Sequence, residues 1–84
     1  MNNNNKLRIG TLNTNGLKSK LQPLISEINK SKCTIFCLQE LHRVEKYQTI
    51  EIEREGKGKL FTNQGTEHST GVGIFIKERN GLEI

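Results

Sequence analysis

The sequence predicts a mixed α/β fold in which a strand–helix–strand unit is followed by hairpin strands. Residues 7–13 alternate side chains as a half-buried strand does. Residues 17–28 place apolar side chains at helical spacing. Short apolar segments at 34–38, 59–62 and 72–77 are typical of strands. We therefore expect a mixed sheet with one helix packed on it.

The first predicted strand, residues 7–13, has one apolar face. Leu7, Ile9 and Thr11 share that face, and we expect it to pack on the core. A turn follows at residues 15–16, where Asn precedes Gly.

The predicted helix carries one apolar stripe and should end near Ser31. The stripe consists of Leu17, Leu21, Leu24, Ile25 and Ile28. Its start has two alternatives, since Ser19 with Gln22 fits a capping box and Pro23 fits a first-turn position.

The middle of the chain contains an apolar segment followed by a charged one. Residues 34–38 are apolar without alternation, which predicts a strand covered on both faces. Residues 43–57 are mostly charged, and Ile50 and Ile52 alternate with glutamates there. This alternation favours a short edge strand or an extended loop. We expect Tyr47, in the same segment, to be a partly buried packing residue.

The last third predicts two strands, residues 59–62 and 72–77, joined by residues 63–70. Residues 56–59 read as a turn, and Asn80 with Gly81 predicts a further hairpin.

The predicted strands expose more apolar surface than one helix can cover. Strands 34–38 and 72–76 offer apolar side chains to both faces, and a bare apolar face needs a second layer. That layer could be a partner chain, self-association or sequence that this chain lacks, and we favour the last.

Polar residues follow the first two strands where those strands end. Asn13 ends the first strand and Asn15 follows it, and Gln39, Glu40 and His42 come after the second strand. A strand–helix–strand unit makes its strands parallel, so both ends meet at one edge of the sheet. Open α/β sheets bind ligands at that edge. A carboxylate and an amide there suit magnesium and phosphate.

Each of these residues has a structural alternative. Asn13 and Asn15 are also turn formers ahead of a glycine, and we prefer the turn role for Asn15. Glu40 could be a solvated loop charge, although its position favours a site. His42 could be plain surface.

Composition limits the chemistry that these 84 residues can perform. The net charge is +4 and the pI is about 9.3, which favours anionic partners such as nucleic acid. All nine acidic residues are Glu, so no mechanism that needs Asp can be assembled from this chain alone. Hydrophobic residues make up 32% of the chain, enough for one small domain.

Other features of the sequence concern the limits of the domain, the state of the cysteines and the cellular compartment. Residues 1–6 form an Asn-rich lead that we expect to be disordered, and residues 7–84 form the domain. Cys33 and Cys37 have no nearby ligand pair for zinc, so we expect buried free thiols. With neither a membrane segment nor a secretory signal, we expect an intracellular, reducing compartment, either nucleus or cytoplasm.

Three motifs in order resemble the endonuclease/exonuclease/phosphatase superfamily. They are residues Asn13–Gly16, Leu38–His42 and Gly71–Phe75, with 27 residues between Asn13 and Glu40. Within the superfamily, the chain is most similar to the abasic-endonuclease-like domain of non-LTR (LINE-type) retrotransposons. The resemblance runs from residue 7 to residue 84 and covers about the first third of such a domain.

The resemblance implies a two-sheet α/β sandwich of which this chain forms part, a Mg²⁺ cofactor and cleavage of a DNA phosphodiester. By this resemblance Glu40 is the metal ligand, and Asn13 helps to hold the metal or the scissile phosphate. His42 is a supporting residue, and Asn15 and Gln39 match the motif. These two catalytic and three supporting residues form the expected site.

The chain departs from the family in its later motifs. The family's general-base His, its orienting Asp, its Asp-x-Asn pair and its catalytic Tyr have no counterpart in the sequence. We therefore expect an N-terminal fragment of a magnesium-dependent DNA endonuclease domain that is inactive alone. The alternatives are a small basic nucleic-acid-binding module without catalysis, or a phosphatase or nuclease fragment of the same superfamily.

Overall fold

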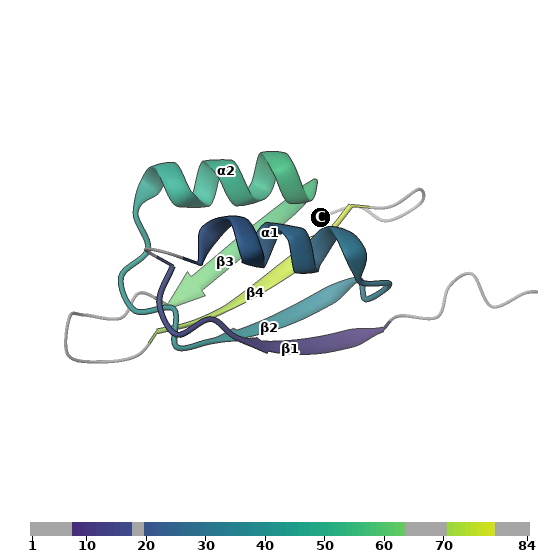
Figure 1. Ribbon diagram of the computed structural model, residues 1–84, viewed down its shortest axis with the longest axis horizontal. Helices are drawn as coiled ribbons and strands as arrows, with labels where there is room; N and C mark the ends of the chain where they lie inside the picture. Colours follow the sequence, from purple (N-terminus) through teal and green to yellow (C-terminus); the bar gives the residue numbers. More distant parts are fainter. Residues whose placement is uncertain (1–7, 18–19, 64–70, 79–84) are drawn as a thin grey trace, which may run out of the picture.

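A computed structural model describes residues 8–17, 20–63 and 71–78. In chain order, its elements are β1 (Ile9–Asn13), α1 (Leu21–Lys30), β2 (Ile35–Gln39), α2 (Lys46–Gly56), β3 (Gly58–Asn63) and β4 (Val72–Lys77). The strands form a four-stranded sheet in the order β1-β2-β4-β3, and both helices lie on the same side of it (Figure 1). The predicted mixed α/β fold is confirmed. The predicted disordered lead, the hairpin at residues 80–81 and most of the 63–70 connection lie outside the described residues.

The sheet pairs its first two strands in parallel and the others antiparallel. β1 and β2 run side by side with Ile9 opposite Ile35 and Asn13 opposite Gln39. Helix α1 connects them, as a parallel pair requires. β4 then runs antiparallel to both β2 and β3. The ends of β1 and β2 therefore lie side by side at one edge of the sheet, as predicted.

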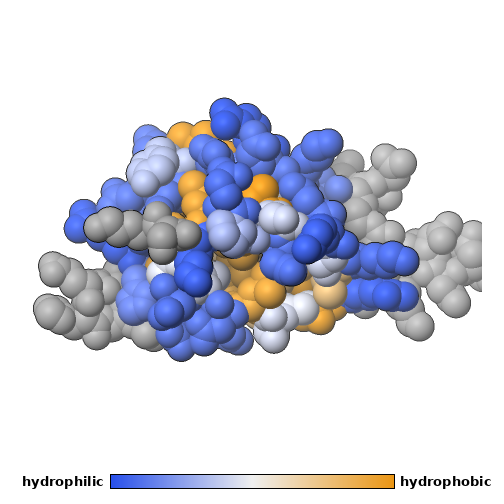
Figure 2. All heavy atoms as spheres, viewed as in Figure 1, coloured by the Kyte–Doolittle hydropathy of each residue, from blue (hydrophilic) through white to orange (hydrophobic). Residues whose placement is uncertain are grey.

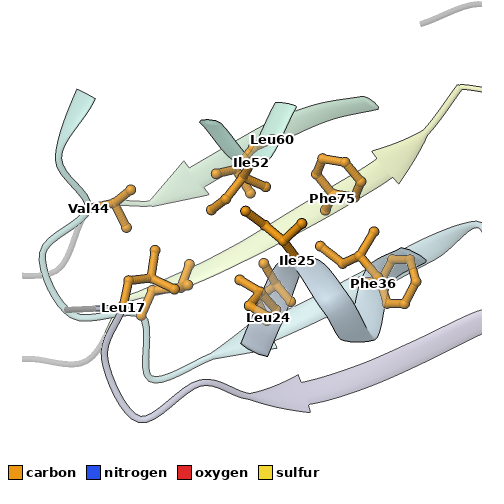
Figure 3. Packing of buried hydrophobic residues seen from close by; sticks show 11 residues of the cluster. Leu17, Leu24, Ile25, Phe36, Val44, Ile52, Leu60 and Phe75 are labelled. Carbon is orange, nitrogen blue, oxygen red and sulfur yellow. The ribbon is translucent and has the colours of Figure 1, made fainter. Parts of the chain in front are cut away.

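The core lies between the sheet and the two helices (Figure 3). At its centre, the rings of Phe36 and Phe75 are 6.4 Å apart between centroids and tilted by 48°. Both rings are essentially inaccessible to solvent. The other buried hydrophobic residues are Leu17, Leu24, Ile25, Ile28, Leu38, Leu41, Val44, Ile52 and Leu60.

The predicted buried face of β1 is wrong. Ile9 is 64% exposed, and Leu12, which alternates with it, packs against the core. Shifting a strand's phase by one residue exchanges its two faces. The helices cover the face that Leu12 shares, so Ile9 and Thr11 point away from the core.

Helix α1 confirms the predicted stripe from Leu21 onward, whereas Leu17 is buried but precedes the helix. Its N-cap is Lys20, which makes no side-chain capping hydrogen bond, and Pro23 falls in the first turn. A proline there loses no intrahelical hydrogen bond, so the first-turn alternative for Pro23 is correct. The N–H of Ser31 donates to Glu27 O at the end of the helix, where the end was predicted.

Helix α2 replaces the edge strand or extended loop predicted for residues 43–57. Its buried residues are Gln48, Ile52 and Gly56, which recur every four residues as one helical stripe. A capping box starts the helix, because the N–H of Glu45 donates to Gln48 Oε1 at 2.8 Å and the Glu45 side chain accepts in return. The helix ends at Gly56, and the left-handed backbone of its C-cap, Lys57, turns the chain into β3. The turn predicted for residues 56–59 is therefore confined to Lys57.

Gly56 lets α2 lie close to the sheet. A Cβ atom at this position would stand 2.9 Å from Cζ of Phe75, closer than real carbon contacts. Tyr47, on the same helix, is 63% exposed, so the predicted packing role for it is wrong.

The second face of the sheet is covered by no described element (Figure 1). We call it the open face. Its apolar side chains are Ile9, Ile35, Cys37, Phe61, Val72, Ile74 and Ile76, four of which rank among the most exposed large hydrophobic residues. Figure 2 shows hydrophobic residues at the surface on the sheet side of the molecule as well as beside the helices. β2 is thus covered on one face only, and not on both as predicted.

The two cysteines lie on opposite sides of β2. Cys33 is half-buried and packs against the core, whereas Cys37 is half-buried on the open face. Both are free thiols, as predicted, although neither is fully buried. No helix in the described part of the chain is long and apolar enough to cross a membrane.

Candidate metal and phosphate site

The ends of β1 and β2 are joined by hydrogen bonds that centre on Thr14. Its N–H donates to Gln39 O at 2.9 Å, and its hydroxyl lies 3.0 Å from Gln39 O and 2.9 Å from Glu40 O. The N–H of Gly16 donates to Glu40 O at 2.7 Å. Thr14 is only 5% exposed, so these bonds are shielded from water. The carbonyl oxygen of Glu40 therefore accepts two hydrogen bonds from the segment that follows β1.

The side chains of Asn13 and Glu40 meet across this junction. Nδ2 of Asn13 donates to Oε2 of Glu40 at 2.8 Å. Oδ1 of Asn13 accepts from the N–H of Asn15 at 3.1 Å, which is the hydrogen bond of an Asx turn. Asn13 thus forms the turn and contacts the carboxylate at the same time, so the two sequence-based alternatives for it are compatible. Asn15 has the turn role that we preferred.

Left-handed backbone is concentrated at this edge of the sheet. Asn15, Glu40 and His42 have φ angles of 51°, 55° and 58°. Such angles cost on the order of 1–3 kcal/mol at non-glycine residues and recur at ligand sites. Leu41 stabilises the arrangement, because its side chain is fully buried and its N–H donates to Gly71 O at 2.9 Å. With Leu41 turned inward, Glu40 and His42 stay nearer the surface.

The other expected site residues are not bonded to this pair. Gln39 is exposed and lies opposite Asn13 in the sheet register, on the same side of the sheet. His42 is half-buried beside Gly16. It lines a hollow of about 540 Å³ together with Arg43 and Tyr47. The site therefore unites Asn13, Asn15 and Glu40, with Gln39 adjacent and His42 set apart in its own hollow.

A second, smaller hollow lies beside Asn13 and is closed by helix α1. It measures about 150 Å³, and Lys20 and Glu27 line it together with Thr14 and Asn15. Lys20 thus brings a cation, and Glu27 an anion, to the hollow that borders Asn13. A cation of this kind attracts a phosphate group, and its position was not expected from the sequence.

The donor set fits a magnesium ion that keeps most of its water. Magnesium prefers oxygen ligands and takes one or two carboxylates from a protein. Glu40 supplies one carboxylate, and no hydrogen bond within the described residues occupies its Oε1. No group of three or more His, Cys or Glu side chains gathers in the described ranges.

Thr14 is the residue of the candidate site that sequence reasoning missed. A threonine between two asparagines looks like part of a polar turn, and only the sheet register shows that it is buried. Its hydroxyl nevertheless fixes the backbone that carries Glu40. A comparison with protein-family models and a search of curated proteins found no match to this chain.

Proposed function

We propose that this chain is the N-terminal part of a magnesium-dependent DNA endonuclease domain of the retrotransposon type. In this proposal it supplies the metal-binding carboxylate and the amide that orients it. The observation that carries the proposal is the 2.8 Å hydrogen bond between Asn13 Nδ2 and Glu40 Oε2, at the ends of adjacent parallel strands.

Each residue of the site has a chemical role in this proposal. Glu40 would hold the metal through the carboxylate oxygen that Asn13 leaves unbonded. Asn13 fixes the carboxylate and retains a second N–H that can donate to a phosphate oxygen. Lys20, which lines the hollow beside Asn13 together with the negatively charged Glu27, could pair with a phosphate there. Mg²⁺, when bound, neutralises charge that develops on the phosphate.

The site lacks a general base. His42 is the one histidine in the described ranges, and it lines a separate hollow. The chain contains no Asp to orient a histidine. General-base catalysis is typically worth about 10²–10⁴-fold in rate. We therefore propose that the chain binds metal and phosphate but needs further residues to cleave DNA.

A basic module that binds nucleic acid without catalysis is the second candidate. The net charge of +4 and the exposed lysines favour it. Binding of this kind weakens steeply with salt and depends on neither Mg²⁺ nor one glutamate.

Fluorescence anisotropy with a labelled DNA duplex separates the two candidates. At constant ionic strength, the endonuclease proposal expects Mg²⁺ to tighten DNA binding, and Glu40→Gln to remove that gain. Glu78→Gln is the matched control, because Glu78 follows β4 at the opposite edge of the sheet. Binding that ignores Mg²⁺ and treats both variants alike would establish the basic module instead.

A further inference from the structure

We propose that the hollow lined by His42, Arg43 and Tyr47 holds one unpaired base of a single-stranded DNA. We call it the Tyr47 hollow. This inference rests on the nucleic-acid binding that both candidate functions share, but it requires neither Mg²⁺ nor Glu40. It starts from the exposed aromatic ring of Tyr47, to which the fold gives no packing role.

The Tyr47 hollow has the size and the lining of a site for a small planar group. Its volume of about 540 Å³ falls within the range of about 300–1,000 Å³ that is usual for ligand pockets. Leu17 and Gln48, which are almost fully buried, form part of its lining. Tyr47 is 63% exposed, so its ring is open to a ligand. The hollow therefore combines a buried interior with an accessible aromatic ring.

The charges in the Tyr47 hollow favour a base over a phosphate. Arg43 and Glu45 both line it, and Nε of Arg43 lies 3.4 Å from Oε2 of Glu45. The Glu45 side chain also accepts a backbone hydrogen bond in the capping box of α2. The two formal charges offset each other, which leaves little attraction for a free phosphate. The terminal amino groups of Arg43 can still donate to acceptor atoms at the edge of a base.

An exposed aromatic ring is the group on which proteins stack unpaired bases. Every base has a π face, so stacking on Tyr47 would show little sequence preference. A base inside a duplex is already stacked and paired, and taking it out costs free energy. The Tyr47 hollow should therefore select a single strand over a duplex.

The Tyr47 hollow lies at the same edge of the sheet as the candidate site. His42 follows Glu40 by two residues. Gly16, which also lines the hollow, donates its N–H to Glu40 O at 2.7 Å. In Figure 1, the start of α2 and the ends of β1 and β2 all lie at the left of the molecule. A strand with a phosphate beside Asn13 can thus place a neighbouring base against Tyr47.

Intrinsic fluorescence tests the proposal, because Tyr47 is the only tyrosine of the chain and there is no tryptophan. We expect a short strand of deoxythymidine nucleotides to quench the emission of Tyr47 saturably. The quenching should occur without Mg²⁺ and should persist in Glu40→Gln. A strand of abasic sites of the same length carries the same charge without bases, so it should leave the emission unchanged. A duplex of the same length should quench far less than the single strand.

The affinity of variants, measured by anisotropy of a labelled strand, completes the test. Tyr47→Ala should weaken binding by about 5- to 150-fold, which is the usual effect of losing one stacked base. Tyr47→Phe keeps the ring and should bind as the wild type does. Ile50→Ala is the matched control, because Ile50 is 52% exposed on the same helix and does not line the hollow. Circular dichroism verifies that each variant is folded.

The possible failures of this proposal are distinguishable from failure of the proposed function. If the strand binds but the emission of Tyr47 does not change, or if Tyr47→Ala binds as tightly as the wild type, the base does not lie in this hollow. Equal quenching by the abasic strand would likewise overturn the proposal, since only the backbone would then be in contact. In all these cases nucleic-acid binding itself would stand. Absence of binding to either strand or duplex would overturn this inference together with both candidate functions.

Discussion

The hydroxyl of Thr14 lies 2.9 Å from the carbonyl oxygen of Glu40, and this contact anchors the left-handed backbone of Glu40. The two residues belong to segments 26 positions apart in the sequence. Their contact explains how a short, open sheet holds a carboxylate at a fixed place on its edge. Because of this contact, a change to the buried hydroxyl of Thr14 should disturb the candidate site, although Thr14 is not one of its expected metal or phosphate ligands.

Replacing Thr14 with valine should destabilise the protein by about 1–3 kcal/mol, because the buried carbonyl groups lose the hydroxyl that faces them. Urea denaturation measures this loss. Thr14→Ser keeps the hydroxyl and should retain most of the stability. Thr11→Val, on the exposed side of the same strand, is the control and should change stability by less than about 0.5 kcal/mol. Equal effects of the two valine substitutions would contradict the anchoring role.

Replacing Gly56 with alanine should destabilise the protein even though alanine is the better helix former by about 1 kcal/mol. The new Cβ atom would lie 2.9 Å from Cζ of Phe75, whose ring is fully buried. Overpacking of this kind typically costs about 1–3 kcal/mol. Thermal unfolding provides the measurement. In a Phe75→Leu background, the added methyl group should cost less, and an unchanged cost would argue against this contact.

Replacing Gln48 with leucine should weaken the start of α2. The change removes the acceptor for the N–H of Glu45, and loss of a cap costs about 0.5–2 kcal/mol. Gln48→Glu preserves the capping box and should leave the helix closer to the native stability. Hydrogen exchange at residues 46–49 reports the difference. Equal protection in the two variants would show that the capping box does not stabilise this helix.

The isolated chain should not nick supercoiled plasmid DNA in the presence of Mg²⁺. None of its described residues combines a base with the orienting carboxylate that activates water. Agarose gels of plasmid incubated with purified protein test this expectation. Nicking that Glu40→Gln abolishes and Glu78→Gln preserves would show that the chain carries a complete active site.

The sequence predicted those parts of the fold that depend on local pattern and chain connectivity. The spacing of Leu24, Ile25 and Ile28 predicts α1, and one helix between two strands makes β1 and β2 parallel. This reasoning placed Asn13 beside Glu40 without any knowledge of contacts.

The missed features depend on tertiary packing. Helix α2 buries a glutamine and a glycine beside Ile52, so its buried stripe is barely hydrophobic. The alternation of Ile50 and Ile52 with glutamates therefore resembled a strand. The wrong face of β1 was predicted to be buried, because Ile9 and Leu12 are both apolar and lie on opposite faces. Only the position of the helices decides which of the two faces is buried. Local periodicity carries no signal for that choice.

The site was predicted only in part for the same reason. Asn13 and Glu40 follow strand ends, which sequence pattern can locate. The buried position of Thr14 depends on the pairing of β1 with β2, and the place of Lys20 at the hollow beside Asn13 depends on how α1 packs on the sheet. Both positions depend on the tertiary structure, which local sequence pattern does not specify.

The central claim, that Asn13 and Glu40 form a metal site, is tested most directly by paramagnetic broadening of amide NMR signals with Mn²⁺ in place of Mg²⁺. We predict selective broadening at Asn13, Glu40 and Gly16, loss of that pattern in Glu40→Gln, and its persistence in Glu78→Gln. Broadening centred elsewhere in the chain, or broadening at these residues that survives Glu40→Gln, would contradict the account.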